Sequence, residues 1–149
     1  MKRWMNISML ILCLLLFCLV GCSDNQLIPG GYISKEEFFD PNGFQDYTDY
    51  CKYYYKDKKL FVNNQEYKKL SESDIKTIGG YFVDFQSWME KEDRTDEFDF
   101  DIGCITAGDY VYIETKEPMS DSDFGKYDNY TIYFFDVDSC VLYYMHQNI

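Results

Sequence analysis

The sequence is short of the residues on which most catalytic and nucleic-acid sites depend. Its 149 residues include one histidine, three prolines and 14 lysines and arginines against 26 acidic residues, a net charge of −12. This acidic balance argues against a nucleic-acid partner, because phosphate binding needs clustered Lys and Arg. A single histidine excludes a histidine-rich zinc site, and we expect no metal or other cofactor.

The common enzyme signatures are missing as well. The sequence contains no phosphate-binding loop and none of the GxSxG, HExxH or CxxC motifs of hydrolases, metalloproteases and redox enzymes. Hydrophobic residues nevertheless make up 46% of the chain, which is enough for a folded core, and 15 of the aromatic residues are tyrosine. At this length we expect one folded domain.

The N-terminus carries the longest apolar run. Twelve apolar residues, 9–20, follow Lys2 and Arg3. As a helix they would rise about 18 Å, too short for a hydrocarbon core of about 30 Å. A buried core helix is the alternative, but the run is apolar all round and stands directly behind a basic start. The pattern therefore predicts a cleaved signal peptide over residues 1–21.

The end of this run, Leu19-Val20-Gly21-Cys22, resembles the lipobox of bacterial lipoprotein precursors. The resemblance implies cleavage between Gly21 and Cys22 and attachment of a diacylglyceryl group to the Cys22 sulfur, with palmitate among the expected acyl chains. Two acyl chains hold a protein stably at a bilayer, whereas one holds it only marginally. The expected location is the extracytoplasmic face of the cell membrane, with Cys22 as the contact to the lipid.

Residues 22–31 are polar and end in Pro-Gly-Gly, so we expect a lipidated cysteine and a tether followed by a single domain over 32–149. Cys51, Cys104 and Cys140 remain in this domain. Three cysteines allow at most one disulfide, for which Cys104–Cys140 is the pair to test. Free, partly buried thiols are the favoured interpretation.

Three helices are predicted in the first part of the domain. Residues 34–37 fit a capping box that opens a short helix, and apolar positions at helical spacing predict a second helix over 44–55. A second capping signal at 71–74 precedes Ile75, Ile78, Phe82, Phe85 and Met89, which is the clearest amphipathic pattern in the chain.

The apolar period then changes to two. Strands are expected around 100–106 and over 110–115, 130–135 and 140–146, with a long acidic loop over 116–129. Short connections favour antiparallel neighbours. The predicted fold class is α+β: N-terminal helices packed in two layers on a three- to four-stranded antiparallel meander.

Aromatic residues supply the candidate binding surface. Tyr53, Tyr54 and Tyr55 could form a stacking platform, together with Trp88 at the end of the long helix. The alternative is that the tyrosines divide between core and surface, because consecutive helical residues point about 100° apart.

Acidic residues offer weaker candidates. Glu97, Asp99 and Asp101 would share one face of a strand and could hold Ca²⁺, but a solvated strand face is the favoured interpretation. Residues 121–125 resemble the start of an EF-hand loop, yet Lys126 and Ile132 stand where the motif needs Gly and Glu. Cys140 and His146 would lie about 20 Å apart on one strand, so they cannot form a nucleophile pair there.

Residues 43–51 and 125–130 resemble segments of small bacterial lipoproteins that have no assigned activity. The resemblance transfers the class and no catalytic residue. We therefore expect a membrane-anchored binding domain for an envelope protein or glycan, without catalytic residues. The alternative is a small envelope hydrolase that uses a pair of carboxylates about 5–9 Å apart.

Overall fold

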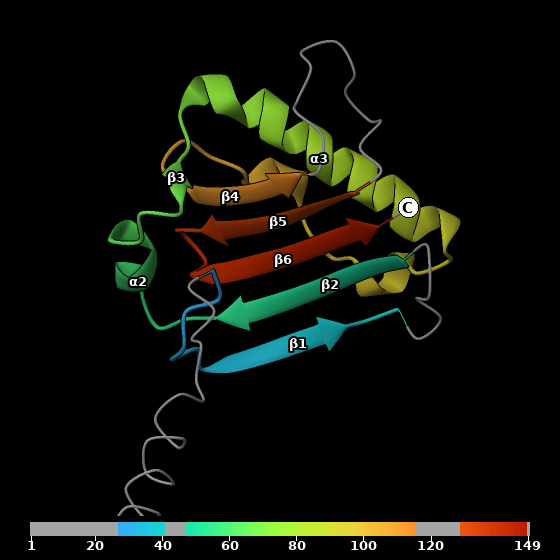
Figure 1. The fold of residues 1–149 in the computed structure, drawn as a ribbon, viewed down its shortest axis with the longest axis horizontal. Helices are drawn as coiled ribbons and strands as arrows, with labels where there is room; N and C mark the ends of the chain where they lie inside the picture. Colours follow the sequence, from blue (N-terminus) through green and yellow to red (C-terminus); the bar gives the residue numbers. More distant parts are fainter. Residues whose placement is uncertain (1–26, 41–46, 116–128, 149) are drawn as a thin grey trace, which may run out of the picture. The chain divides into compact units, whose positions relative to one another are not determined.

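A single antiparallel sheet dominates the protein. The computed structural model describes residues 27–40, 47–115 and 129–148. Six strands lie in the order β1-β2-β6-β5-β4-β3 (Figure 1). Their bounds are β1 Ser34–Phe38, β2 Tyr47–Tyr54, β3 Lys68–Lys69, β4 Tyr110–Thr115, β5 Asn129–Asp136 and β6 Val141–Asn148. The helical elements are α2 Lys59–Val62, α3 Glu72–Lys91 and the 3₁₀ turns η1 Thr95–Glu97 and η2 Ile102–Cys104.

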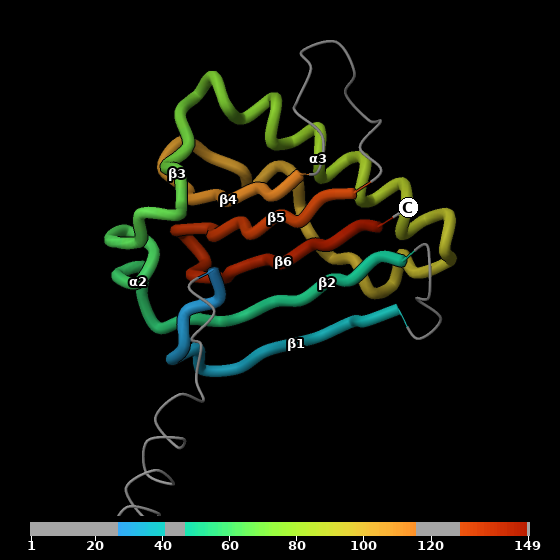
Figure 2. The backbone as a smooth tube through the Cα atoms, in the orientation of Figure 1, coloured from blue at the N-terminus to red at the C-terminus, as the bar shows by residue number. Residues whose placement is uncertain are grey.

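Along the sequence, the strands at the two edges of the sheet come before the strands in its middle. β1 and β2 pair first, and the chain then passes through α2 to β3 at the opposite edge (Figure 2). After α3, the meander β4-β5-β6 runs back across the sheet until β6 pairs with β2 along eight residues. The pairing that closes the sheet therefore joins segments almost a hundred residues apart in the sequence.

Helix α3 is the long helix that the sequence predicts, and its prediction is confirmed. The Ser71 side chain and the Asp74 carboxylate form a capping box at its first turn. One stripe of the helix is buried: Ile78, Tyr81, Phe82, Phe85 and Met89. The stripe packs against the sheet residues Tyr50, Val111, Tyr130, Ile132, Phe134 and Met145, which together with it form the main hydrophobic core. A two-layer arrangement of helix on sheet results.

The predicted helices before α3 are wrong. Residues 47–54 form β2, the second strand of the sheet, and residues 34–38 form the edge strand β1. The sheet consequently has six strands, so the expected N-terminal helices on a three- to four-stranded meander are replaced by one long helix on a larger sheet.

The expected strand around residues 100–106 is also wrong, because η1, η2 and irregular chain occupy that region. Phe98 and Phe100 still point into the core, so the alternation of side chains is correct although no strand pairs there. The strands β4, β5 and β6 confirm the three later strand predictions.

The leader, the lipobox and Cys22 lie outside the described residues, as does the acidic loop 116–128. All the elements above belong to a compact unit that spans Gly31–Ile149. Within the described residues, no helix combines the length and hydrophobicity needed to cross a bilayer.

Candidate functional site: the open face of the sheet

The two faces of the sheet have different neighbours. Successive residues of a strand point to opposite faces, so the strand residues that pack on α3 define one face and their neighbours define the other. We call this second face the open face. It carries Lys35 and Glu37 of β1, Tyr47, Asp49, Cys51 and Tyr53 of β2, Tyr110, Tyr112 and Glu114 of β4, Asn129, Thr131, Tyr133 and Phe135 of β5, and Leu142, Tyr144, His146 and Asn148 of β6.

One end of the open face is covered. The ring of Phe61 in α2 stacks on Phe135 with centroids 3.8 Å apart, and Tyr55 and Tyr67 pack edge-on against Phe61 at 4.9 and 5.2 Å. All four rings are buried. This end is therefore a second, smaller core, and a ligand surface has to lie farther along the strands.

An aromatic strip crosses the rest of the open face. We define the aromatic strip as Tyr112, Tyr133, Tyr144, His146 and Tyr47, which come from four neighbouring strands. Successive ring centroids are 5.9, 5.2, 6.4 and 5.3 Å apart, within the range of favourable ring contacts. Tyr133, the second ring along it, is buried and the other four rings are partly exposed. The strip is thus a continuous but ridged aromatic surface.

A row of polar side chains borders the strip. The strand register sets Glu114 opposite Thr131, Thr131 opposite His146, and His146 opposite Asp49. The Thr131 Oγ lies 2.8 Å from His146 Nδ1, and the Tyr47 hydroxyl lies 3.1 Å from Nε2. Both ring nitrogens therefore have hydrogen-bond partners, which fix the orientation of the imidazole.

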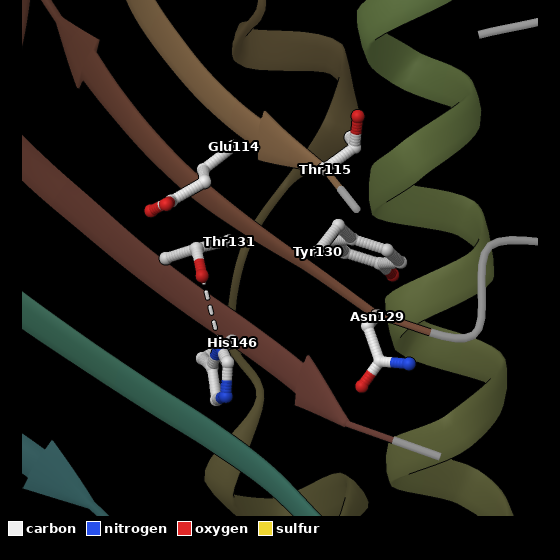
Figure 3. Close-up of a pocket in the computed structure, with 6 residues that line it drawn as sticks. All are labelled: Glu114, Thr115, Asn129, Tyr130, Thr131 and His146. Atoms are coloured by element: carbon white, nitrogen blue, oxygen red, sulfur yellow. Dashed lines mark hydrogen bonds between the residues drawn. The ribbon is translucent and has the colours of Figure 1, made fainter. Parts of the chain in front are cut away.

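A cavity of about 190 Å³ opens at the end of this row. Its lining consists of Glu114, Thr115, Asn129, Tyr130, Thr131 and His146 (Figure 3). Cavities for drug-sized ligands span roughly 300–1,000 Å³, so this one fits a single ring or side chain of a larger ligand. Its polar groups offer carboxylate, hydroxyl, amide and imidazole contacts.

The cavity connects to a buried polar network under α3. The Tyr130 hydroxyl lies 2.8 Å from Gln147 Oε1 and 3.1 Å from the Asp84 carboxylate of α3. Burial raises the pKa of Asp84, although the Tyr130 hydroxyl and the Gln147 amide partly oppose that shift. Burial also raises the pKa of Tyr130, so its hydroxyl stays protonated. This wall of the cavity is therefore fixed by hydrogen bonds.

The binding residues predicted from the sequence do not come together. Tyr53 and Tyr55 are buried at the covered end of the open face. Tyr54 points to the α3 side and donates to Glu36 at 2.9 Å. Trp88 lies on α3, where the Lys91 ammonium stands 3.7 Å from the centre of its ring. Tyr53, Tyr54 and Tyr55 thus divide between core and surface, the alternative that the sequence left open.

The acidic residues proposed for Ca²⁺ also have separate structural partners. Asp99 pairs with Lys52 at 2.7 Å, Glu97 pairs with Arg94 at 2.7 Å, and Asp101 accepts from the Gly103 amide at 2.8 Å. Within the described ranges, no group of three or more acidic, cysteine or histidine side chains is placed to hold a metal ion.

The two most buried aspartates stabilise turns. Asp109 accepts from the Thr106 and Val137 amides at 2.7 and 3.0 Å. Asp136 accepts from the Asp138 amide at 2.8 Å and from the Ser139 hydroxyl at 2.7 Å. These bonds account for the burial of both carboxylates without a chemical role.

Cys51, Cys104 and Cys140 are free thiols, so the pair Cys104–Cys140 is not bonded. Cys51 lies diagonally from His146 on the neighbouring strand of the open face. Burial, however, raises the pKa of the Cys51 thiol to about 12, and that of Cys104 also to about 12. Both thiols stay protonated at neutral pH, and the thiolate is the form that attacks.

Comparison with known proteins identifies no family for this chain. No family model matches the chain, and neither a curated protein nor a solved structure matches it.

Proposed function

We propose that this protein is an extracytoplasmic lipoprotein whose sheet domain binds an envelope glycan through the open face. The anchor is Cys22, modified after removal of residues 1–21. The observation that carries the binding role is the aromatic strip with its polar border, on the side of the sheet that α3 leaves uncovered, beside the cavity at the strand ends.

The chemistry of the strip suits a neutral, hydroxyl-rich ligand. Sugar rings present apolar C–H faces that pack on aromatic rings, and their hydroxyls need donors and acceptors at the edge. Tyr112, Tyr144 and Tyr47 supply the rings, while Glu114 and Thr131 supply edge contacts. Tyrosine is also common at protein interfaces, so an envelope protein is the partner that the experiment must separate from a glycan.

The anchor is supported by sequence chemistry. Lys2 and Arg3, the short apolar run and Leu19-Val20-Gly21-Cys22 stand in the order that lipoprotein processing requires. The acidic domain should be repelled by anionic lipid headgroups, which leaves its open face available to envelope ligands.

The anchor is tested by labelling cells with radioactive palmitate. We expect the parent chain and a Cys18→Ser control to be labelled and to fractionate with membranes. Cys22→Ser should lose the label and keep its leader, because no thiol remains for the thioether. A parent chain without label, or equal label in Cys22→Ser, would contradict the anchor.

The open face is tested by co-sedimentation of the detergent-solubilised full chain with insoluble envelope glycan from which protein has been removed. Tyr112→Ala and Tyr144→Ala should each weaken binding by roughly tenfold, the loss expected for a central aromatic contact. Val83→Ala, at an exposed position of α3, is the control and should bind as the parent does. Retention only by glycan that still carries its proteins would identify a protein partner instead.

A further inference from the structure

Strand β1 leaves one edge of the sheet exposed. It pairs with β2 on one side, and its residues 34–37 are exposed. An edge strand presents backbone N–H and C=O groups that can pair with another strand. Two apolar residues flank it: Ile33 is 69% exposed and Phe39 is 55% exposed. In the part of the chain that the structure describes, this edge therefore combines an unpaired outer side with apolar ends.

The side chains of this edge are complementary to their own reverse order. The register with β2 places Lys35 and Glu37 on the open face, and Ile33 and Phe39 flank the strand at its two ends. Within one copy the Lys35 ammonium lies 2.7 Å from the Glu37 carboxylate. The order is apolar, basic, acidic, apolar, and in the opposite direction it is apolar, acidic, basic, apolar. When the segment faces a second copy in antiparallel orientation, each charge can therefore exchange its partner within the copy for the opposite charge of the second copy.

Symmetry restricts how two copies can pair. A two-fold axis normal to the sheet keeps the same faces on the same side, so residues of the open face can only oppose residues of the open face. With the axis at Glu36, Lys35 faces Glu37 of the second copy and Ile33 faces Phe39 of the second copy. An axis at Lys35 or at Glu37 would place two identical open-face charges opposite each other and set the remaining open-face charge opposite an apolar residue, which is unfavourable. With the axis at Glu36, the two Glu36 side chains are the one like-charged pair.

The residue at the axis has a cationic partner within each copy. Glu36 points to the α3 side, where its carboxylate lies 2.6 Å from the Lys52 ammonium and accepts from the Tyr54 hydroxyl at 2.9 Å. Lys52 itself is buried and also pairs with Asp99. The Lys52 ammonium, shared by two carboxylates, therefore reduces the repulsion between two Glu36 side chains without cancelling it.

We propose that the protein forms a symmetric homodimer through antiparallel pairing of β1 with β1 of a second copy, centred on Glu36. The sheet then continues across both copies, and the two open faces lie on the same side. The inference goes beyond the proposed function, because it depends neither on the ligand nor on the lipid.

Charge reversal tests the register directly. Sedimentation equilibrium of the full chain in a density-matched detergent should show a monomer–dimer equilibrium. Lys35→Glu and Glu37→Lys should each weaken dimerisation by roughly tenfold or more, because each places two like-charged pairs across the axis. An equimolar mixture of the two variants should dimerise as tightly as the parent, and so should the double variant. Lys76→Glu, an exposed change of the same charge on α3, is the control and should dimerise as the parent does.

Three results would overturn the proposal. They are a parent chain that remains monomeric at all accessible concentrations, a Lys35→Glu variant that behaves as Lys76→Glu does, and a mixture that associates no better than either single variant. A monomeric parent would leave the edge to a strand of a different protein.

Discussion

At the scale of single residues, burial decides the protonation state of the titratable side chains. Cys51 and His146 lie on neighbouring strands of the open face, yet the pKa of Cys51 stands at about 12 because its thiol is buried. The same effect acts on Asp84 of α3, whose pKa is raised by burial beside Tyr130. Burial thereby keeps the Cys51 thiol in its neutral form and shifts the Asp84 carboxyl toward its neutral form.

Asp84 gives a prediction on pH and stability. Because its pKa is higher in the folded chain, the folded state binds the proton more tightly, and this contribution to stability is lost as pH rises through the folded pKa. Asp84→Asn should therefore unfold at a higher urea concentration than the parent at neutral pH. Its stability should also change less than that of the parent above about pH 4, the ordinary range of an aspartate.

The measurement is urea unfolding across a pH series, followed by tyrosine fluorescence. Glu90→Gln, at an exposed position of the same helix, is the control and should keep the pH dependence of the parent. A steeper loss of stability with rising pH in Asp84→Asn would show that the sign of the shift is wrong.

At the scale of elements, the end of α3 fixes the helix to two strands. The chain turns at Asp93, which has a positive φ of 57°, and the Arg94 amide then donates to the Met89 carbonyl at 2.8 Å. This turn directs the Arg94 guanidinium to the Thr48 carbonyl at 2.6 Å and the Phe38 carbonyl at 3.1 Å. One side chain thus joins the helix terminus to β2 and to the end of β1.

Arg94→Ala should lower the free energy of unfolding by about 2–4 kcal/mol, because two carbonyls lose charged donors and the Glu97 carboxylate loses its partner. Arg94→Lys should recover less than half of that loss, since an ammonium cannot reproduce the planar fork. Lys91→Ala, at the same helix end, should cost less than about 1 kcal/mol as an exposed cation–π contact. Equal losses for Arg94→Ala and Lys91→Ala, measured by urea unfolding, would contradict this role.

The sequence predicts the elements that have one buried face. α3 repeats apolar residues at helical spacing, and β4 alternates Val111 and Ile113 with tyrosines. Both elements can therefore be recognised from the sequence. β2 is buried on both faces, because α3 covers one side while Tyr32 packs edge-on against Tyr53 on the other. Burial on both faces removes the alternation, and the remaining apolar spacing imitates a helix.

The short helix predicted at residues 34–37 was wrong for a different reason. Its Ser34 and Glu37 fit a capping box, but charged residues are also the usual protection of an edge strand. The choice between the two depends on whether β2 is a strand, which local sequence does not decide. In the aromatic strip only Tyr47 depends on the pairing of β2 with β6. The other four rings lie on β4, β5 and β6, and they were missed because the strand predictions carried no register to show which side chains become neighbours.

At the scale of the whole molecule, one sheet separates two environments. The helix side holds the main core and the ion pairs around Lys52 and Arg94. The other side holds the small core at α2 and, beyond it, the aromatic strip, with the cavity at the strand ends next to it. The proposed ligand recognition belongs to this second side.

Hydroxyl-radical footprinting of the full chain, with and without envelope glycan, shows which side of the sheet the ligand covers. We expect added glycan to protect Tyr112, Tyr144 and His146 from oxidation while the oxidation of Trp88 on α3 is unchanged. Protection of Trp88 with unchanged oxidation of the three open-face residues would contradict it.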